Sequence, residues 1–280
     1  MYLKQQLLME VKTIFNIIKA DVKRLMRSKS IIVMPILILL MTAMLSALFA
    51  GLKYVMSLDL SAVLGDSMDA LAAVGNIANT GYDMAIMNLQ SDTLIYIMIV
   101  ILLSVSAFDF SAGTVKNMLS IGKSKKQIYL SKLITSCIWT ILAVIFYAFS
   151  STLMGAIFFG FDITGEQIVD IVLITLQQIP VYLSVIVMGH MFVFITQKVA
   201  SSMLLYIGSF MLFETVMPLI DLILDLPFKI SLLMPLYQLI ELTSMETNLV
   251  GYLTIYISCA IYIITSIVSG YYLFKKAELK

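Results

Sequence analysis

The chain has 280 residues, of which 61% are hydrophobic and only 12% are charged, and its mean hydropathy is +1.01. Soluble domains are roughly 45–50% apolar and about 25% charged, so the composition excludes an ordinary soluble domain and predicts an integral membrane protein. The net charge of +1 does not suggest nucleic-acid binding, Cys137 and Cys259 lie in apolar runs where no disulfide is expected, and no residue spacing predicts a metal site.

Residues 1–29 are predicted to form an amphipathic helix that lies along the membrane surface. Apolar residues recur at helical spacing from Leu3 through Ile18 to Met26, and most of the basic residues fall on other faces. Two interpretations stay open for this segment. It is either a surface anchor held by anionic lipid or a lever that a cytoplasmic partner moves.

Six apolar runs are long enough to cross a membrane, for which a helix needs roughly 20 residues. The second run is short and bounded by Asp92 and Asp109, so we expect it to extend into the headgroup region. The predicted fold is an all-α membrane protein with a single domain over residues 1–280. The six predicted spans are Ile31–Ala50, Thr93–Phe108, Leu133–Phe159, Ile168–Thr196, Val199–Leu219 and Val250–Phe274.

The distribution of Lys and Arg predicts the orientation of these spans. Seven basic residues precede the first span, five lie between the second and third, one lies between the fourth and fifth, and three follow the sixth. These segments all face the same side, and only Lys53 and Lys229 fall on the other side. Because basic residues concentrate on the cytoplasmic side of membrane proteins, we expect a multi-pass protein of the cell membrane with both termini in the cytoplasm.

A polar stretch, "FDFSAGTVKNMLSIGKSKKQIYLSKL", separates the second and third spans. Gly122-Lys123-Ser124 within it resembles the end of a phosphate-binding loop, but such a loop requires a glycine five residues before Gly122, and Asn117 stands there. We therefore expect no nucleotide site, no cofactor and no catalytic residue in this chain.

The same stretch carries the signals of a helix, a sharp turn and a second helix. Thr114 is predicted to cap a short helix over Val115–Ile121, Gly122 to end it, and Ser124 with Gln127 to form the capping box of the next helix. Val115, Met118 and Leu119 share one face of the short helix. The spacing alone fits a helix that rests on the membrane surface as well as one that docks a partner.

The same stretch resembles the loop between the second and third spans of ABC-2 type permeases, which are the membrane subunits of bacterial ABC exporters. The residues that carry the resemblance are Asp109-Phe110, Gly113-Thr114-Val115-Lys116-Asn117, Leu119, Gly122 and Ser124-Lys125, followed by Tyr129 and Ser131-Lys132. Many of these permeases begin the loop with Glu where this chain has Asp109. The resemblance implies that the loop forms a coupling helix that docks on a separately encoded ATPase, while residues 1–29 form a connecting helix. The residues implied in docking are Asp109, Thr114, Val115, Lys116, Asn117, Met118, Leu119 and Ile121.

The resemblance also implies a function. The chain is expected to pair with a second permease copy or a relative, and with two ATPase subunits that bind ATP and Mg, to export an amphipathic or hydrophobic compound such as a peptide, an antibiotic or a lipid-like molecule. On this interpretation the chain is not itself an enzyme.

Glu214 supports a rival interpretation, because a carboxylate inside a predicted span is costly and often functional. A proton-coupled secondary transporter would use it as the titrating group. Alternatively, Glu214 makes a satisfied polar contact with His190, Gln177 or Gln178, or with a partner subunit. His190 stands apart from other ligand residues and does not predict a metal site.

Two external regions are also predicted. Pro218, Pro227 and Pro235 break the apolar stretch after the fifth span into pieces too short to cross a bilayer, which favours short re-entrant or interfacial helices. The acidic segment Gly51–Gln90 is expected outside the cell, where it either contacts the substrate or remains solvated.

The charge distribution gives a direct test of orientation. In a background without Cys137 and Cys259, cysteines introduced at Ser67, Asp162 and Glu246 should react with a membrane-impermeant reagent on intact cells. A cysteine introduced at Ser120 should react only after the cells are opened. Labelling of position 120 from outside would reverse the predicted orientation.

Overall fold

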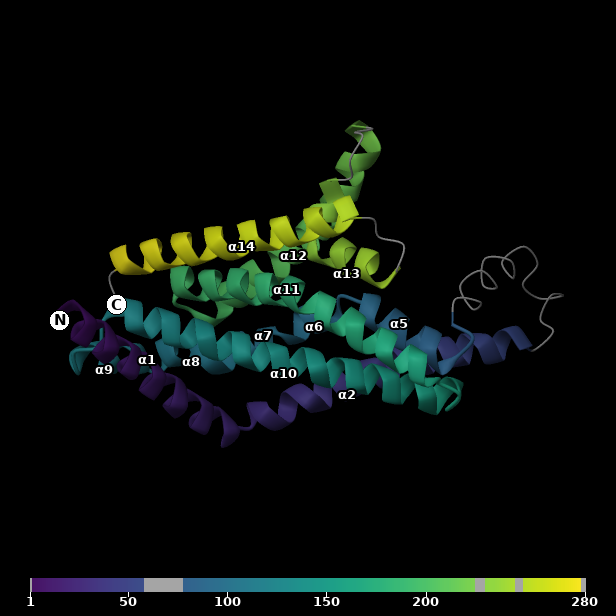
Figure 1. The fold of residues 1–280 in the computed structure, drawn as a ribbon, viewed down its shortest axis with the longest axis horizontal. Helices are drawn as coiled ribbons and strands as arrows, with labels where there is room; N and C mark the ends of the chain where they lie inside the picture. Colours follow the sequence, from purple (N-terminus) through teal and green to yellow (C-terminus); the bar gives the residue numbers. More distant parts are fainter. Residues whose placement is uncertain (1, 58–77, 225–229, 245–248, 278–280) are drawn as a thin grey trace.

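The computed structural model describes residues 2–57, 78–224, 230–244 and 249–277, and the regular structure in these ranges is entirely helical (Figure 1). Six helical stretches are long and apolar enough to span a membrane, in agreement with the sequence prediction. Residues 58–77 of the predicted external segment, as well as Pro227, lie outside the described ranges. The fold is therefore an all-α, multi-pass architecture.

Most spans are longer than their apolar runs because polar residues continue the helices beyond them. The third span, for example, begins at the capping box before Lys125 rather than at Leu133. The second span consists of four helical pieces in succession, one of which is a π-helical turn, over residues 93–111. The spans are α2 (Ser30–Ser57), the pieces α6 (Thr93–Ile97), α7 (Ile99–Leu102), η1 (Leu103–Ala107) and α8 (Phe108–Ser111), then α10 (Lys125–Phe159), α11 (Gly165–Thr196), α12 (Val199–Leu224) and α14 (Leu249–Lys276).

The helices α10 and α11 form the centre of the bundle, and α11 packs on its other side against α14, which lies along one edge (Figure 1). The start of α1 (Tyr2–Met26), the end of α14 and the short helix α9 (Thr114–Ser120) lie at one end of the bundle, which we call the terminal end. From there α1 runs obliquely along α10 and meets α2 at an elbow. The fifth span, α12, is the least enclosed, since only Ser202, Tyr206 and Phe210 are buried in it.

The second span is preceded by α5 (Gly81–Gln90), and the helix is broken between them at Ser91 and Asp92. Neighbouring spans supply donors to backbone carbonyls around the break. The Tyr147 hydroxyl donates to the Asn88 carbonyl, Gln178 Nε2 donates to the Leu89 carbonyl (2.9 Å), and the Tyr206 hydroxyl donates to the Ile95 carbonyl (2.6 Å). A buried helix break is stable only when such partners replace the missing bonds.

The helix α5, at the end of the segment Gly51–Gln90, does not merely remain solvated. It packs closely against α10, and five of its ten residues are buried. Close approach is possible because Gly81 and Gly155 face one another across the contact, where a side chain on either would meet backbone atoms. This part of the segment is thus built into the bundle.

The region after the fifth span contains short helices, as predicted, although Pro218 does not interrupt α12, which continues to Leu224. A 3-10 turn, η2 (Ile230–Leu233), leads into α13 (Pro235–Thr243), which has Pro235 in its first turn and is too short to cross a bilayer. The Asp221 carboxylate accepts from the Ile230 and Ser231 amides at 2.6 and 2.9 Å, so it fixes η2 to the end of α12.

Candidate functional site

The predicted helix between the second and third spans is present as α9, with both of its ends set by glycine. Gly113, with φ 71°, is the residue that precedes the helix, so Thr114 is its first residue and not the predicted cap. Gly122, with φ 87°, ends it as predicted: the Lys123 amide donates to the Met118 carbonyl (3.1 Å), and the Gly122 amide donates to the Leu119 carbonyl (2.9 Å). The left-handed conformation at both positions explains why glycine stands there.

The capping box predicted for the following helix is also present. The Ser124 side chain accepts from the Gln127 amide (3.2 Å), and the Gln127 side chain accepts from the Ser124 amide (3.1 Å). The chain therefore reverses direction within a few residues between α9 and α10.

The apolar face of α9 points into the protein. Val115 is 1% exposed and belongs to the hydrophobic core, and Met118 and Leu119 pack against that core. Of the residues predicted to dock a partner, Lys116 and Asn117 are exposed and Thr114 is partly exposed. Ile121 is 77% exposed just beyond the helix. A partner at this surface would contact these outward residues, whereas Val115 is not accessible to it.

Asp109, on the helical piece α8 that precedes α9, is the centre of a cluster of four charged side chains, of which only Arg24 is substantially exposed. Its two oxygens pair with two cations: one oxygen accepts from Lys132 on α10, and the other accepts from Arg24 on α1. Lys132 also donates to Asp21 Oδ1 on α1 (2.7 Å), and Arg24 Nη2 lies 3.4 Å from the same oxygen. We call Asp21, Arg24, Asp109 and Lys132 the charge cluster.

The charge cluster joins three segments that are far apart in the sequence: α1, the end of the second span and the start of the third. Three of its members are almost fully buried, with Asp21 6%, Asp109 3% and Lys132 1% exposed. Its two cations and two carboxylates balance in charge, as burial of ions requires. Arg24 additionally donates to the Ser104 carbonyl in the π-helical turn (3.4 Å).

The two carboxylates of the cluster are not equivalent. Both oxygens of Asp109 are paired, but Asp21 Oδ2 is buried without a hydrogen-bond partner. Burial raises the pKa of Asp21 above its ordinary value, although Lys132 and Arg24 oppose this shift. Burial therefore opposes the charge of Asp21, whereas both oxygens of Asp109 are held by cations.

Sequence reasoning identified Asp109 but did not assign a role to Asp21, Arg24 or Lys132. A signal was present in the helical spacing, because Asp21 lies between Ile17 and Leu25 at intervals of four residues, and all three are buried. A carboxylate in the apolar stripe of an amphipathic helix requires a buried cation.

A second link at the terminal end joins α10 to the end of α14. Lys125 Nζ donates to the carbonyls of Phe274 (3.3 Å), Lys275 (3.0 Å) and Ala277 (2.7 Å). The last carbonyls of a helix lack intrahelical partners, and a cation there also interacts favourably with the helix dipole. Lys125, which follows the capping residue Ser124, therefore also anchors the end of α14.

Glu214 lies on α12, away from the charge cluster, and its partner differs from those expected. Tyr96 donates to Glu214 Oε2 (2.9 Å), whereas Gln178 is engaged with a backbone carbonyl, and the buried His190 ring packs against Tyr129 and Phe194. Glu214 Oε1 has no hydrogen-bond partner among the described residues. Throughout the described residues, no group of three or more His, Cys, Asp or Glu side chains is placed so that it could hold a metal ion.

The unequal carboxylates of the charge cluster give a stability prediction. Asp109→Asn leaves Lys132 and Arg24 with one carboxylate between them, and breaking a buried ion pair costs about 3–5 kcal/mol. Asp21→Asn leaves Asp109 paired with both cations and removes a carboxylate that has only one bonded oxygen, so its cost should be nearer about 1 kcal/mol. The measurement is the midpoint of thermal unfolding of the purified protein in detergent. Asp162→Asn, at an exposed position, is the control, and an Asp109→Asn protein as stable as this control would contradict the role given to the cluster.

Comparison with known proteins places the chain in a family without identifying an activity. No curated protein sequence matches it. A family model described as "Protein of unknown function (DUF2705)" matches residues 67–279, which is more than half of the chain and includes α9, Asp109 and Lys132. The chain belongs to the DUF2705 family.

Proposed function

We propose that this protein is the permease subunit of an ATP-binding cassette exporter and that α9 is the element on which a separate ATPase acts. The observation that carries the proposal is the charge cluster, because it connects Asp109 on α8, the helical piece that precedes α9, to α1 and to the third span. On this proposal the terminal end lies in the cytoplasm, as the excess of Lys and Arg there favours.

The contacts suggest how force from an ATPase reaches the spans. Pressure on the exposed residues of α9 is transmitted through its buried apolar face to the core and through Asp109 to the two cations. Displacement of Asp109 alone would leave the buried Lys132 with only Asp21 and would break the pair with Arg24, so α1, α8 and α10 are expected to move together. This favours the lever interpretation of α1 over a passive anchor.

Six spans supply one half of a transport pathway on this proposal. Apolar side chains are exposed along α2 and α12, including Ile36, Leu40, Met44, Leu204 and Leu212, and these surfaces are available to lipid or to a second subunit. A two-fold pair with another copy or a relative would place the path for an amphipathic or hydrophobic substrate between the subunits. Two ATPase subunits, which bind ATP and Mg, would complete the assembly.

The outward position of Ile121 gives a docking test that leaves the core intact. Leu119→Asp would disturb the permease itself, since Leu119 packs against the core, but Ile121 is 77% exposed. We expect Ile121→Asp to lower co-purification with the ATPase encoded by a neighbouring reading frame by at least about tenfold, because it buries an unpaired carboxylate in the interface. Phe161→Asp, at a residue 76% exposed at the opposite end of α10, should have no effect.

Equal co-purification of the Ile121→Asp and Phe161→Asp proteins would contradict docking at α9. The same conclusion would follow if amides of α9 gained no protection from hydrogen exchange when the ATPase is added.

A proton-coupled secondary transporter is the rival function, and the unpaired oxygen of Glu214 is the observation that favours it. If a proton gradient drives transport, Glu214 must exchange a proton during the cycle. If ATP drives transport, Glu214 only needs to accept the hydrogen bond from Tyr96, and Gln can also accept it.

The two functions predict opposite results for Glu214→Gln. In proteoliposomes with permease and ATPase, and with ATP but no pH gradient, we expect the variant to retain at least about half of the export rate, because the Tyr96 contact survives. Glu214→Leu strands the Tyr96 hydroxyl and is expected to lower the yield of folded protein. Transport that requires the gradient, ignores ATP and is lost in Glu214→Gln would favour the carrier instead.

A further inference from the structure

We propose that the helix break before the second span binds a monovalent cation of the size of sodium. The break lies at Ser91 and Asp92, between α5 and the first helical piece of the second span. The proposal rests on the oxygen atoms that surround this break and on the negative charge beside them. It does not depend on the proposed transport function.

Three buried side chains near the break carry an oxygen that has no hydrogen-bond partner among the described residues. These oxygens are Asn88 Oδ1, Gln178 Oε1 and the Tyr182 hydroxyl, and their side chains are 0–1% exposed. Gln178 and Tyr182 are four residues apart on α11, so they lie on the same face of that helix. Because a buried polar atom is costly to leave unpaired, the three oxygens together point to a bound ion.

Neighbouring hydrogen bonds hold these side chains against the break. Gln178 Nε2 donates to the Leu89 carbonyl at 2.9 Å, which fixes the Gln178 amide at the end of α5. The Tyr147 hydroxyl donates to the Asn88 carbonyl and also interacts with the Ser91 side chain. The break is therefore lined by amide, hydroxyl and carbonyl oxygens, which are the ligands that hard cations prefer.

Asp92 places a negative charge beside these oxygens. It interacts electrostatically with both Tyr147 and Tyr182, and it also contacts Tyr96, but within the described ranges no basic side chain forms an ion pair with it. The last carbonyls of α5 add the negative end of a helix dipole. One carboxylate among neutral oxygens suits a monovalent ion, whereas sites for calcium usually contain several carboxylates.

A crevice between α5 and α13 gives an ion a route toward the break (Figure 1). It has a volume of about 280 Å³, and its lining includes Tyr82, Asp83, Gln90 and Thr243. Gln90 is the last residue of α5, and Ser91 follows it directly. Membrane transporters bind sodium at broken helices, where helix C-terminal ends and unwound carbonyls face the ion.

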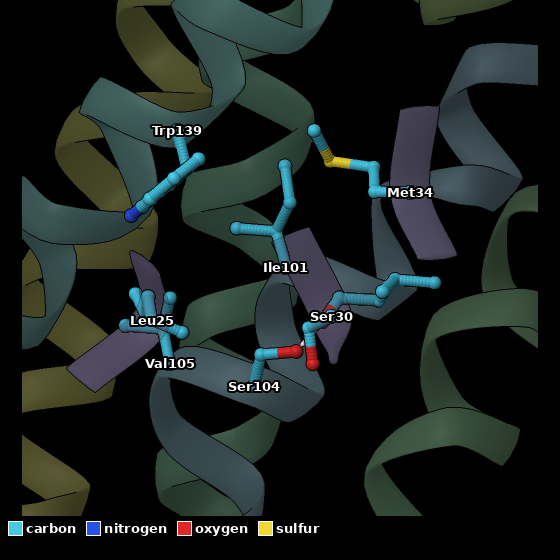
Figure 2. Close-up of a pocket in the computed structure, with 8 residues that line it drawn as sticks. Leu25, Ser30, Met34, Ile101, Ser104, Val105 and Trp139 are labelled. Atoms are coloured by element: carbon cyan, nitrogen blue, oxygen red, sulfur yellow. Dashed lines mark hydrogen bonds between the residues drawn. The ribbon is translucent and has the colours of Figure 1, made fainter. Parts of the chain in front are cut away.

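The enclosed space beside the elbow of α1 and α2 lacks these features (Figure 2). Its volume is about 20 Å³, room for roughly one water molecule. Most of its lining is apolar, and its two hydroxyls belong to Ser30 and Ser104, the second of which donates to the Val100 carbonyl at 2.6 Å. With no carboxylate in its lining, this space offers a cation no compensating charge.

The test compares thermal unfolding of the purified protein in detergent with sodium chloride and with N-methylglucamine chloride at equal ionic strength. An ion that binds only the folded protein raises the midpoint of unfolding. We expect sodium to raise it by about 3–6 °C at a concentration about tenfold above the dissociation constant. Radioactive sodium should also bind to the immobilised protein, and excess unlabelled sodium should displace it.

Tyr182→Phe is the sharpest variant, because it removes an unpaired hydroxyl and breaks no hydrogen bond among the described residues. In N-methylglucamine it should be at least as stable as the natural sequence, whereas sodium should raise its midpoint by about 1 °C or less. Asp92→Asn, at a half-buried position, should lose the sodium shift as well. Tyr206→Phe is the matched control: it loses the bond to the Ile95 carbonyl, so its midpoint should fall in both salts while the sodium shift remains.

Equal midpoints in the two salts, or no displaceable radioactive sodium, would overturn the proposal for the natural sequence. A sodium shift that survives either Tyr182→Phe or Asp92→Asn would place the ion outside the break, which is also a contrary result. Loss of the shift in Tyr206→Phe would show that the shift follows general loosening of this region. A larger rise with calcium than with sodium would contradict the assignment to a monovalent ion.

Discussion

Burial of charge is the constraint on which the terminal end of this protein depends. Asp109 and Lys132 are almost completely removed from solvent, and neither could be buried without the other, because an isolated ion in an apolar interior is very costly. Asp21 and Arg24 complete the balance from a different helix. The amphipathic helix is consequently an integral part of the bundle, and its angle to α10 is set by ion pairs as well as by apolar contacts.

The burial of charge at Asp109 also limits how far α9 can move independently of the spans. A two-turn helix joined to the spans only by flexible loops could shift without moving anything else. Here a rigid glycine turn at each end, a buried apolar face and the paired Asp109 leave it little freedom. On the proposed function its exposed residues would contact the ATPase, and its buried residues would couple that surface to the interior. This combination suits an element that transmits force.

Local features were readily predicted from the sequence, and contacts between distant segments were not. The six spans, the Gly122 turn and the Ser124–Gln127 capping box each depend on residues within one helix or turn, so hydropathy and capping rules identify them. The partner of Asp21 lies 111 residues away, and Tyr96 and Glu214 are separated by 118 residues. Which polar side chains meet depends on how the helices pack, and helical periodicity does not contain that information. The close packing of α5 was missed for the same reason.

The helix break before the second span and the elbow between α1 and α2 differ in how firmly they are held. Donors from the third, fourth and fifth spans each occupy a backbone carbonyl near the break, so sliding any of these helices would leave a buried polar group unpaired. These hydrogen bonds hold the helices in the middle of the bundle in fixed positions relative to one another. The elbow between α1 and α2 lacks such bracing, since no regular helix covers residues 27–29. On the proposed transport function, motion would therefore concentrate at this hinge, and the braced middle would move as one body.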